Sequence, residues 1–360
     1  MARFPRLCGL LVASACLAAA CSDQSGVSRA TKVDKVPGMQ SDDGTSFVPP
    51  EPDPEKLGPP IELFEWGKPE IVASEGWEPA KQEVRAHNYQ RTGSQRFELS
   101  LDGELTPSMG STALEKQTQP TTFLRGIVHV EGAADMGARL WVQVLEVRLR
   151  GAGGDPFGLG VAAQRLLRVS RLRVELDATG LPKRATLEIP KEVDKELRPH
   201  LPAIFTIASG LARLFVPVPD KAAKGQSWTV REKFVDGGTL VTQSSTYRVS
   251  EVDGASVHLD VAIEQAGEWW GHHPHVSFGL EAYQDVELPD LVEPESFEYE
   301  GRGHGKLEVD LLEPLAVAAQ SGVIRTSRTV VEEKGARQEA SLRQEVRLRF
   351  GSSEPPGPVN

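Results

Sequence analysis

The chain has 360 residues, with 40 Lys and Arg against 51 Asp and Glu, and a net charge of −11. Residues 1–20 hold two arginines and no acidic residue, so the remainder carries 38 basic and 51 acidic side chains, or −13. This acidic balance argues against nucleic acid as a partner and against charge-driven docking on anionic lipid, because both need a basic surface. All 3 cysteines lie within residues 1–21, which excludes disulfides and thiol chemistry from the rest of the chain.

Residues 1–20 have the parts of an export signal peptide. Arg3 and Arg6 form the basic start, and the apolar run after them is too short to span a bilayer as a helix. The run ends in Leu17-Ala18-Ala19-Ala20-Cys21, which resembles the lipobox, the processing site of bacterial lipoproteins. The resemblance implies cleavage before Cys21, acyl chains such as palmitate on that cysteine, and attachment to a membrane of the cell envelope through those chains.

Two alternatives to lipidation at Cys21 stay open. Cys16 is a second candidate for the acylated cysteine, and the segment also fits an ordinary secretory signal cut after Ala20. In the lipoprotein interpretation Ser22, not an aspartate, follows the modified cysteine. Under the sorting rule of the enterobacterial lipoproteins that this one resembles, this implies the periplasmic face of the outer membrane.

Residues 21–83 are predicted to form a disordered, proline-rich tether. Segments such as Val48-Pro49-Pro50-Glu51-Pro52-Asp53-Pro54 hold too few apolar side chains to compensate for the entropy cost of ordering. Phe64, Trp66 and Trp77 near the end of this stretch are expected to dock on the following domain or to bind a partner as a short motif. Residues 351–360 are predicted to be a loose tail.

Residues 84–350 are predicted to form one β-rich domain. Its halves, 84–190 and 226–350, are joined by a helical segment over 191–215. Apolar side chains recur at helical spacing in that segment, and Pro199 and Pro202 interrupt its earlier part, so the helix is expected over about 201–214.

In the first half, apolar and polar residues alternate with a period of two, which predicts strands. Phe97 belongs to the first alternating run, and Asp102-Gly103 predicts a turn after it. A shift of the alternation after Val144 predicts a bulge. The other predicted elements are strands over 121–131, 138–150, 168–177 and 184–189 and a glycine-rich loop over 151–160.

The second half returns to strands. Asp236-Gly237-Gly238 predicts a hairpin. Residues 126–133 followed by 140–144 resemble residues 247–255 followed by 257–261, which suggests an internal duplication. The predicted strands cover residues 227–235, 239–252, 257–264, 304–310, 322–332 and 341–350.

Two motifs resemble a family of uncharacterised bacterial envelope lipoproteins with a duplicated β-rich domain. One is Leu214-Phe215-Val216-Pro217-Val218-Pro219-Asp220-Lys221 with Gly225-Gln226-Ser227-Trp228; the other is the run over 301–310 with Ser321-Gly322. The resemblance covers residues 84–350 and implies a strongly curved antiparallel sheet, like the half-barrel of lipoprotein carriers. The expected fold class is therefore mainly β, a half-barrel-like sheet with one central helix. The family contributes no catalytic residue.

The candidate ligand or partner contacts are Trp269, Trp270, Phe205 and Leu211. The two tryptophans lie in an aromatic and histidine-rich run, and the other two residues lie on the predicted helix. Trp141 and Trp228 are instead expected to fill the core.

A weak metal candidate is formed by His272, His273 and His275, which could bind Zn²⁺ together with His304 or Asp285. A proline turns the chain between the second and third of these histidines, so the three imidazoles need not face one point. The simpler interpretation is a surface loop without a metal, and no cofactor is expected.

The chain contains no G-x-S-x-G, H-E-x-x-H, P-loop or C-x-x-C motif. We therefore expect a non-enzymatic, membrane-anchored envelope lipoprotein that binds an apolar ligand or lipid in its curved sheet. The alternatives are a structural or assembly factor that binds another envelope protein and a metal-dependent hydrolase at the histidine cluster. A filled core with exposed Trp269 and Trp270 would favour the assembly factor.

Overall fold

The computed structural model of the chain describes residues 50–351, apart from residues 65, 79–88, 90–92, 135–136, 152–154, 156–157, 237, 271–292 and 334–335. The described strands form one 15-stranded antiparallel sheet. They are β1 (Ile61–Glu62), β2 (Glu70–Glu75), β3 (Ser94–Met109), β4 (Thr112–Ala113), β5 (Gln117–Thr118), β6 (Thr121–Ala134), β7 (Gly137–Arg150), β8 (Arg171–Leu176), β9 (Pro182–Glu188), β10 (Ser227–Asp236), β11 (Thr239–Asp253), β12 (Ser256–Trp269), β13 (Ser296–Asp310), β14 (Ala316–Glu333) and β15 (Ala336–Gly351). The described helices are η1 (Pro54–Lys56), α2 (Leu159–Leu167), η4 (Arg198–His200) and α3 (Leu201–Ala212).

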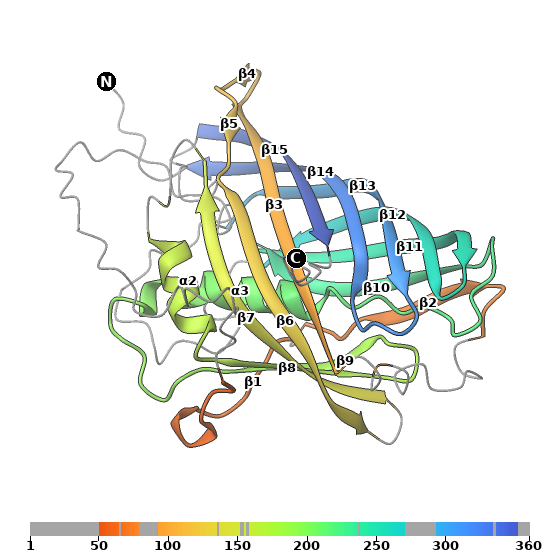
Figure 1. Cartoon of the computed structure of the whole chain (residues 1–360). Helices are drawn as coiled ribbons and strands as arrows, with labels where there is room; N and C mark the ends of the chain where they lie inside the picture. Colours follow the sequence, from red (N-terminus) through yellow and green to blue (C-terminus); the bar gives the residue numbers. More distant parts are fainter. Residues whose placement is uncertain are drawn as a thin grey trace, which may run out of the picture.

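The sheet curves around α3, with β3, β6 and β7 on one side of the helix and β10 to β14 on the other (Figure 1). The strand order is β1-β9-β8-β7-β6-β3-β15-β14-β13-β12-β11-β10-β2, and β4 and β5 pair with β3 beside this path. The edge strands β1 and β2 are joined by residues 63–69, and a connection of that length spans at most about 30 Å. This connection therefore limits the separation of the two open edges at these strand ends to about 30 Å. The predicted mainly β fold, a curved antiparallel sheet with a central helix, is confirmed.

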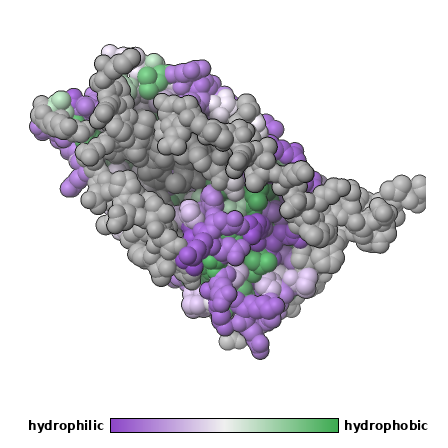
Figure 2. Space-filling view, turned by 90° about the vertical axis from the view of Figure 1, so that its left-hand side faces the viewer, coloured by the Kyte–Doolittle hydropathy of each residue, from purple (hydrophilic) through white to green (hydrophobic). Residues whose placement is uncertain are grey.

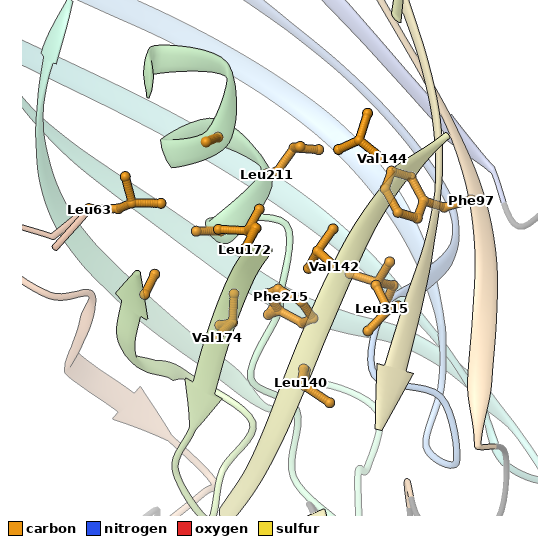
Figure 3. Close-up of a cluster of buried hydrophobic side chains, with 14 of the residues drawn as sticks. Leu63, Phe97, Leu140, Val142, Val144, Leu172, Val174, Leu211, Phe215 and Leu315 are labelled. Atoms are coloured by element: carbon orange, nitrogen blue, oxygen red, sulfur yellow. The ribbon is translucent and has the colours of Figure 1, made fainter. Parts of the chain in front are cut away.

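The helix α3 is buried on the concave side of the sheet. Pro202 occupies its first turn, where no intrahelical N–H is needed. Phe205 has no exposed area and Leu211 is 2% exposed. Figure 3 shows Leu211 and Phe215 among apolar side chains of β7 and β8 such as Leu172. Burial of each large apolar side chain contributes about 1.5–3 kcal/mol, so these contacts fix the helix in the sheet.

The predicted bulge in β7 is present and is supported by the neighbouring helix α2. Val144 and Glu146 pair with consecutive residues of β6, which leaves Leu145 as the extra residue. The side chain of Gln164 in α2 takes over the bonds that the bulge leaves open. Its Nε2 donates to the Leu145 carbonyl at 2.8 Å, and its Oε1 accepts from the Val147 N–H.

Two local predictions for the first half are wrong. The loop predicted over 151–160 ends early, because α2 begins at Leu159 and packs four apolar side chains into the core. Asp102-Gly103 makes no turn, since β3 continues through it. A Cβ on Gly103 would lie 2.5 Å from Gln119 Oε1 and 3.0 Å from the Glu345 carbonyl. This glycine therefore provides space for close neighbours rather than a change of direction.

The predicted tether over 21–83 is too long at its C-terminal end. Residues 21–49, including Cys21, lie outside the described residues, but η1, β1 and β2 belong to the folded domain. Leu57 is 5% exposed and forms a β-bridge with Pro190. Trp77 is 7% exposed, with its ring 5.1 Å from that of Trp228. The docking interpretation of this segment is confirmed.

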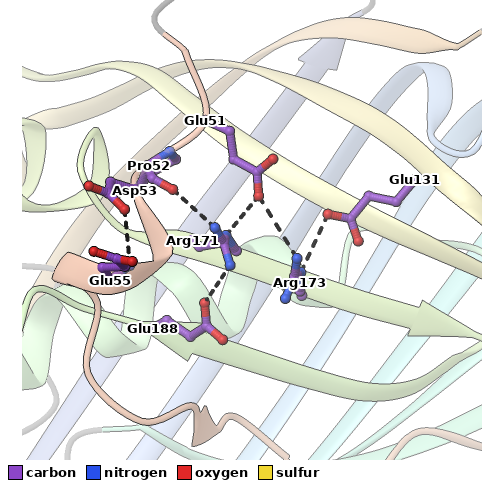
Figure 4. Close-up of polar contacts among 8 residues, drawn as sticks. All are labelled: Glu51, Pro52, Asp53, Glu55, Glu131, Arg171, Arg173 and Glu188. Atoms are coloured by element: carbon purple, nitrogen blue, oxygen red, sulfur yellow. Dashed lines mark hydrogen bonds and ion pairs between the residues drawn. The ribbon is translucent and has the colours of Figure 1, made fainter.

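The point at which the N-terminal segment joins the sheet is an arginine cluster on β8 (Figure 4). Arg171 is 5% exposed, and its guanidinium donates to the Pro52 carbonyl at 3.0 Å. The same group forms ion pairs with Glu51 at 2.9 Å and with Glu188 at 3.2 Å. Arg173 links Glu51, at 3.8 Å, to the sheet as well. Charged hydrogen bonds of this kind are stronger than neutral ones, so residues 51–52 are firmly held.

Candidate functional site

The concave side of the sheet holds a cavity of about 280 Å³ near the C-terminal end of α3. Its walls come from β3, β10, β11, β14 and β15, from the end of α3 and from the connection between β1 and β2. Leu101, Val346 and Leu348 supply an apolar part of the lining. The cavity therefore lies between the buried helix and the part of the sheet that this helix leaves uncovered.

A row of polar side chains, which we call the polar belt, crosses the concave face at the level of this cavity. Strand pairing places six residues side by side on six consecutive strands, β10 to β15. Five of them are polar, Glu232, Gln243, Gln265, Arg325 and Gln344, and Gly301 of β13 occupies the sixth position. The next row toward the core contains Val230, Ile263, Val323 and Val346, together with Ser245 and Gly303, so the belt borders a row that is mostly apolar.

The β10 to β13 part of the belt satisfies its own hydrogen bonds. Gln243 Nε2 donates to Glu232 Oε1 at 2.9 Å, and Gln265 Nε2 donates to Gln243 Oε1 at 2.6 Å. Tyr299 donates its hydroxyl to Gln265 Oε1 at 3.3 Å. Gly301 leaves room for this arrangement, because a Cβ there would lie 2.6 Å from Gln265 Oε1. A connected network of this kind fixes the orientation of each side chain.

Arg213, just after α3, joins the helix to the belt. Its Nε lies 3.1 Å from Glu232 Oε2. Its Nη1 donates to the Ser209 carbonyl at 2.9 Å, and its Nη2 donates to the Lys233 carbonyl at 3.2 Å. Both terminal nitrogens therefore donate hydrogen bonds within the protein, and Nε faces Glu232 in an ion pair without a hydrogen bond of good geometry.

Burial opposes both charges of this ion pair. It raises the pKa of Glu232, and the facing guanidinium acts in the opposite direction. Burial also lowers the pKa of Arg213, against the effect of the carboxylate. The guanidinium lies over the rings of Phe64 at 5.1 Å and Phe234 at 5.5 Å, and such contacts favour the cation.

Arg325 is the second arginine of the cavity, and it is far less engaged. Its Nη1 donates to Asp236 Oδ2 at 2.5 Å. Burial disfavours its charge, but Asp236 and Tyr299 more than offset this, and the pKa of Arg325 is raised. Among the described residues this is its one hydrogen bond, and its Nε is buried without a partner.

Two glutamine amides complete this wall of the cavity. Gln119 lies over Gly103 of β3, and its Nε2 is buried without a hydrogen-bond partner among the described residues. Gln344 is 8% exposed and lines the cavity, and no described residue bonds to its amide. The β14, β15 and β3 side of the cavity therefore presents donors that the described protein leaves unused, and buried groups of this kind normally have partners.

The site residues proposed from the sequence fall in several places. Phe205 and Leu211 lie in the core and do not line the cavity. Trp270 stacks edge-on against Trp66, with ring centroids 4.2 Å apart, and Trp66 lines the cavity. The ring of Trp269 is 5.7 Å from that of Phe297, two strand positions beyond Tyr299. Of the described residues in the sequence-based site, Trp270 is thus the one that lies beside the cavity, through its contact with Trp66. Trp141 and Trp228 are buried, as predicted.

The histidine candidates receive no support from the described part of the chain. His272, His273, His275 and Asp285 lie outside the described residues, and His304 is exposed on β13. Within the described ranges, no three His, Cys, Asp or Glu side chains are placed to hold a metal ion. In the same ranges, no helix has the length and hydropathy needed to cross a membrane.

A second hollow, of about 540 Å³, lies between α2, β7 and residues 190–197. Its exposed rim pairs Arg165 with Asp194 at 3.0 Å and with Glu196 at 2.5 Å. The described surface in Figure 2 is mostly hydrophilic, with small hydrophobic areas between the polar residues. Since solvent-exposed ion pairs satisfy each other there, the concave cavity is the stronger candidate site.

Comparisons with known proteins place the chain in no family. No family model and no curated protein matches it. Among solved structures, OpdQ of Pseudomonas aeruginosa matches at 9% identity over 72% of this chain and 98% of its own, with a TM-score of 0.19. OmpT of Vibrio cholerae, an outer membrane protein, matches at 6% identity over 71% of this chain and 99% of its own, with a TM-score of 0.16. Likenesses this low carry no argument about function.

Proposed function

We propose that this protein is a lipid-anchored protein of the bacterial cell envelope that binds an apolar or amphiphilic molecule in the concave cavity. The observation that carries the proposal is the polar belt beside apolar cavity walls. Buried charged and polar rows of this kind are often less stabilising than apolar residues of similar volume. A row of polar residues that lowers folding stability and borders the concave cavity supports a binding site there.

The size and lining of the cavity narrow the class of ligand. Its volume of about 280 Å³ lies just below the roughly 300–1,000 Å³ that is common for small-molecule sites. This suits one acyl chain or a small amphiphile better than a lipid with two chains. The apolar side chains of Leu101, Val346 and Leu348 would contact the chain, and the belt would face the polar end.

The anchor in this proposal is Cys21, acylated after removal of residues 1–20. Its support is the lipobox-like run before Cys21 and the net charge of −13 for the rest of the chain, which disfavours attachment to anionic lipid by charge alone. The proposed location is the periplasmic face of the outer membrane.

Native mass spectrometry of the full-length chain carrying Cys21→Ser, purified from bacterial cells, tests the binding function. The substitution removes the acyl chains, so any bound mass is a separate molecule. We expect a small bound mass that organic solvent strips. Val346→Phe, which fills the cavity, should abolish it. Ile324→Phe, on an outward position of β14 that is 42% exposed, should keep it.

A bare protein, or a bound mass that survives Val346→Phe, would contradict the proposal. A bare protein would direct attention to the alternative, a structural or assembly factor that binds another envelope protein.

A further inference from the structure

We infer that the ligand of the concave cavity is a single-chain amphiphile whose polar end is an oxyanion, received by Arg325, Gln344 and Gln119. The inference rests on the proposed binding function and names the chemical class of its ligand. The shared chemistry is a carboxylate or phosphate group on one apolar chain.

The three donors lie on one cavity wall, Arg325 and Gln344 on neighbouring strands and Gln119 in the connection between β5 and β6. Arg325 of β14 and Gln344 of β15 are directly paired across the ladder, and Gln344 pairs in turn with Leu105 of β3. Gln119 lies over Gly103, two positions along the same strand from Leu105. Side chains at paired and diagonal positions of adjacent strands are close enough to contact one small group together.

Arg213 and Arg325 show which donors are free to bind. Both arginines line the cavity, but Arg213 donates from both terminal nitrogens, to the Ser209 and Lys233 carbonyls, and forms an ion pair with Glu232. Arg325 carries five N–H donors like any arginine, and the one bond that it makes to a described residue goes from Nη1 to Asp236. Arg213 therefore holds α3 against the sheet, and Arg325 is left to receive a ligand.

The kind of donor decides the kind of acceptor. A buried guanidinium with unused N–H groups is best matched by an ionised oxygen group that accepts several charge-assisted hydrogen bonds. The amides of Gln344 and Gln119 add neutral donors beside it, next to the Asp236 carboxylate that pairs with Arg325 and to Asp102 of β3, which also lines the cavity. A hydroxyl or ester of the same chain length offers fewer and weaker acceptors. The wall therefore distinguishes an acid from a neutral amphiphile.

Calorimetric titration of the full-length chain carrying Cys21→Ser with decanoate, decan-1-ol, decyl phosphate and acetate tests the inference. We expect decanoate or decyl phosphate to bind at least about tenfold more tightly than decan-1-ol, the effect of one charged hydrogen bond. The stronger of the two acids identifies the head group. Acetate, which lacks the chain, should not bind measurably.

Gln344→Leu provides the matched variant, because it removes a donor without leaving a charge unpaired. It should weaken acid binding about tenfold, leave decan-1-ol binding unchanged and leave the melting temperature unchanged or raised. Gln320→Leu, at an exposed outward position of β14, should leave binding of both ligands unchanged.

Equal affinity for the acids and for decan-1-ol would overturn the oxyanion inference and keep the proposed function. No binding of any ten-carbon compound would overturn the proposed function itself. Tight binding of acetate would overturn the requirement for a chain.

Discussion

The ion pair between Arg213 and Glu232 should be strongly coupled in its effect on stability. Both side chains are nearly buried, at 11% and 13% exposed. Removing one partner of a buried pair leaves an uncompensated charge and costs about 3–5 kcal/mol. We therefore expect Arg213→Met and Glu232→Leu each to lower the free energy of unfolding by about that amount.

The double variant should cost much less than the sum of the two single variants. Replacing both charges by apolar side chains is often neutral. What remains is the loss of three hydrogen bonds, two from Arg213 to the Ser209 and Lys233 carbonyls and one from Gln243 to Glu232, at about 1 kcal/mol each. The expected cost is therefore about 3 kcal/mol, against about 6–10 kcal/mol for the sum.

Urea unfolding of the wild type and the three variants at pH 7.5 and pH 4.5 measures these differences. Burial raises the pKa of Glu232, so protonation favours the folded state below the ordinary glutamate pKa of about 4.3. This contribution is lost as the pH rises through the raised folded value. The defect of Arg213→Met should accordingly shrink at pH 4.5. A double variant that costs as much as the two singles together would refute the reasoning.

Four further outcomes are expected. Gly303→Ala should destabilise the protein by about 1–3 kcal/mol in urea unfolding, because the added Cβ would lie 2.4 Å from the Gly322 carbonyl. Gly322→Ala should be nearly neutral, because its Cβ would lie 3.9 Å from the nearest atom. Equal effects of the two substitutions would contradict this packing. Burial lowers the pKa of His200, so the contribution of the neutral imidazole to the free energy of unfolding is complete above about pH 6.5 and is lost at lower pH. The stability of the wild type relative to His200→Gln should therefore fall between pH 7.5 and pH 5. A difference that stays constant with pH would contradict this. Arg171→Met should release residues 51–52 and speed hydrogen exchange in η1 and β1, with unchanged exchange as the contrary result. Cys21→Ser should abolish labelling with radioactive palmitate and release the protein from the membrane fraction, and labelling that persists would place the anchor elsewhere.

The regular strands of the second half could be predicted from the sequence because each has one buried and one exposed face. The hairpin at Asp236 and the helix near residues 201–214 have equally local signals, namely a Gly-rich turn and helical spacing after a proline. The helix α2 could not be predicted in this way, since it is short and follows a glycine-rich stretch. The edge strands β1 and β2 lie among prolines and acids, and their order depends on pairing with β9 and β10.

Sequence patterns do not reveal the candidate site, because the site depends on the register in which the strands pair. Gln243, Gln265 and Gln344 look like ordinary polar positions in alternating strands. They become a row only when six strands are aligned, and a shift of one residue would turn each side chain to the outer face. Trp66 and Trp270 stand out in the sequence only as separate aromatic residues, and no sequence pattern indicates that their rings are in contact beside the cavity. A polar residue in phase with the apolar face is the signal that would have pointed to the belt.

The most direct test of ligand binding on the concave face is a side-chain amide spectrum. The ¹H–¹⁵N signals of the glutamine amides, assigned with Gln→Leu variants, can be followed while decanoate is added to the full-length chain carrying Cys21→Ser. We predict that the signals of Gln119 and Gln344 shift together and saturate, while that of the outward-facing Gln320 stays in place. Shifts confined to Gln320 and other exposed amides, with Gln119 and Gln344 unchanged, would contradict ligand binding in the concave cavity.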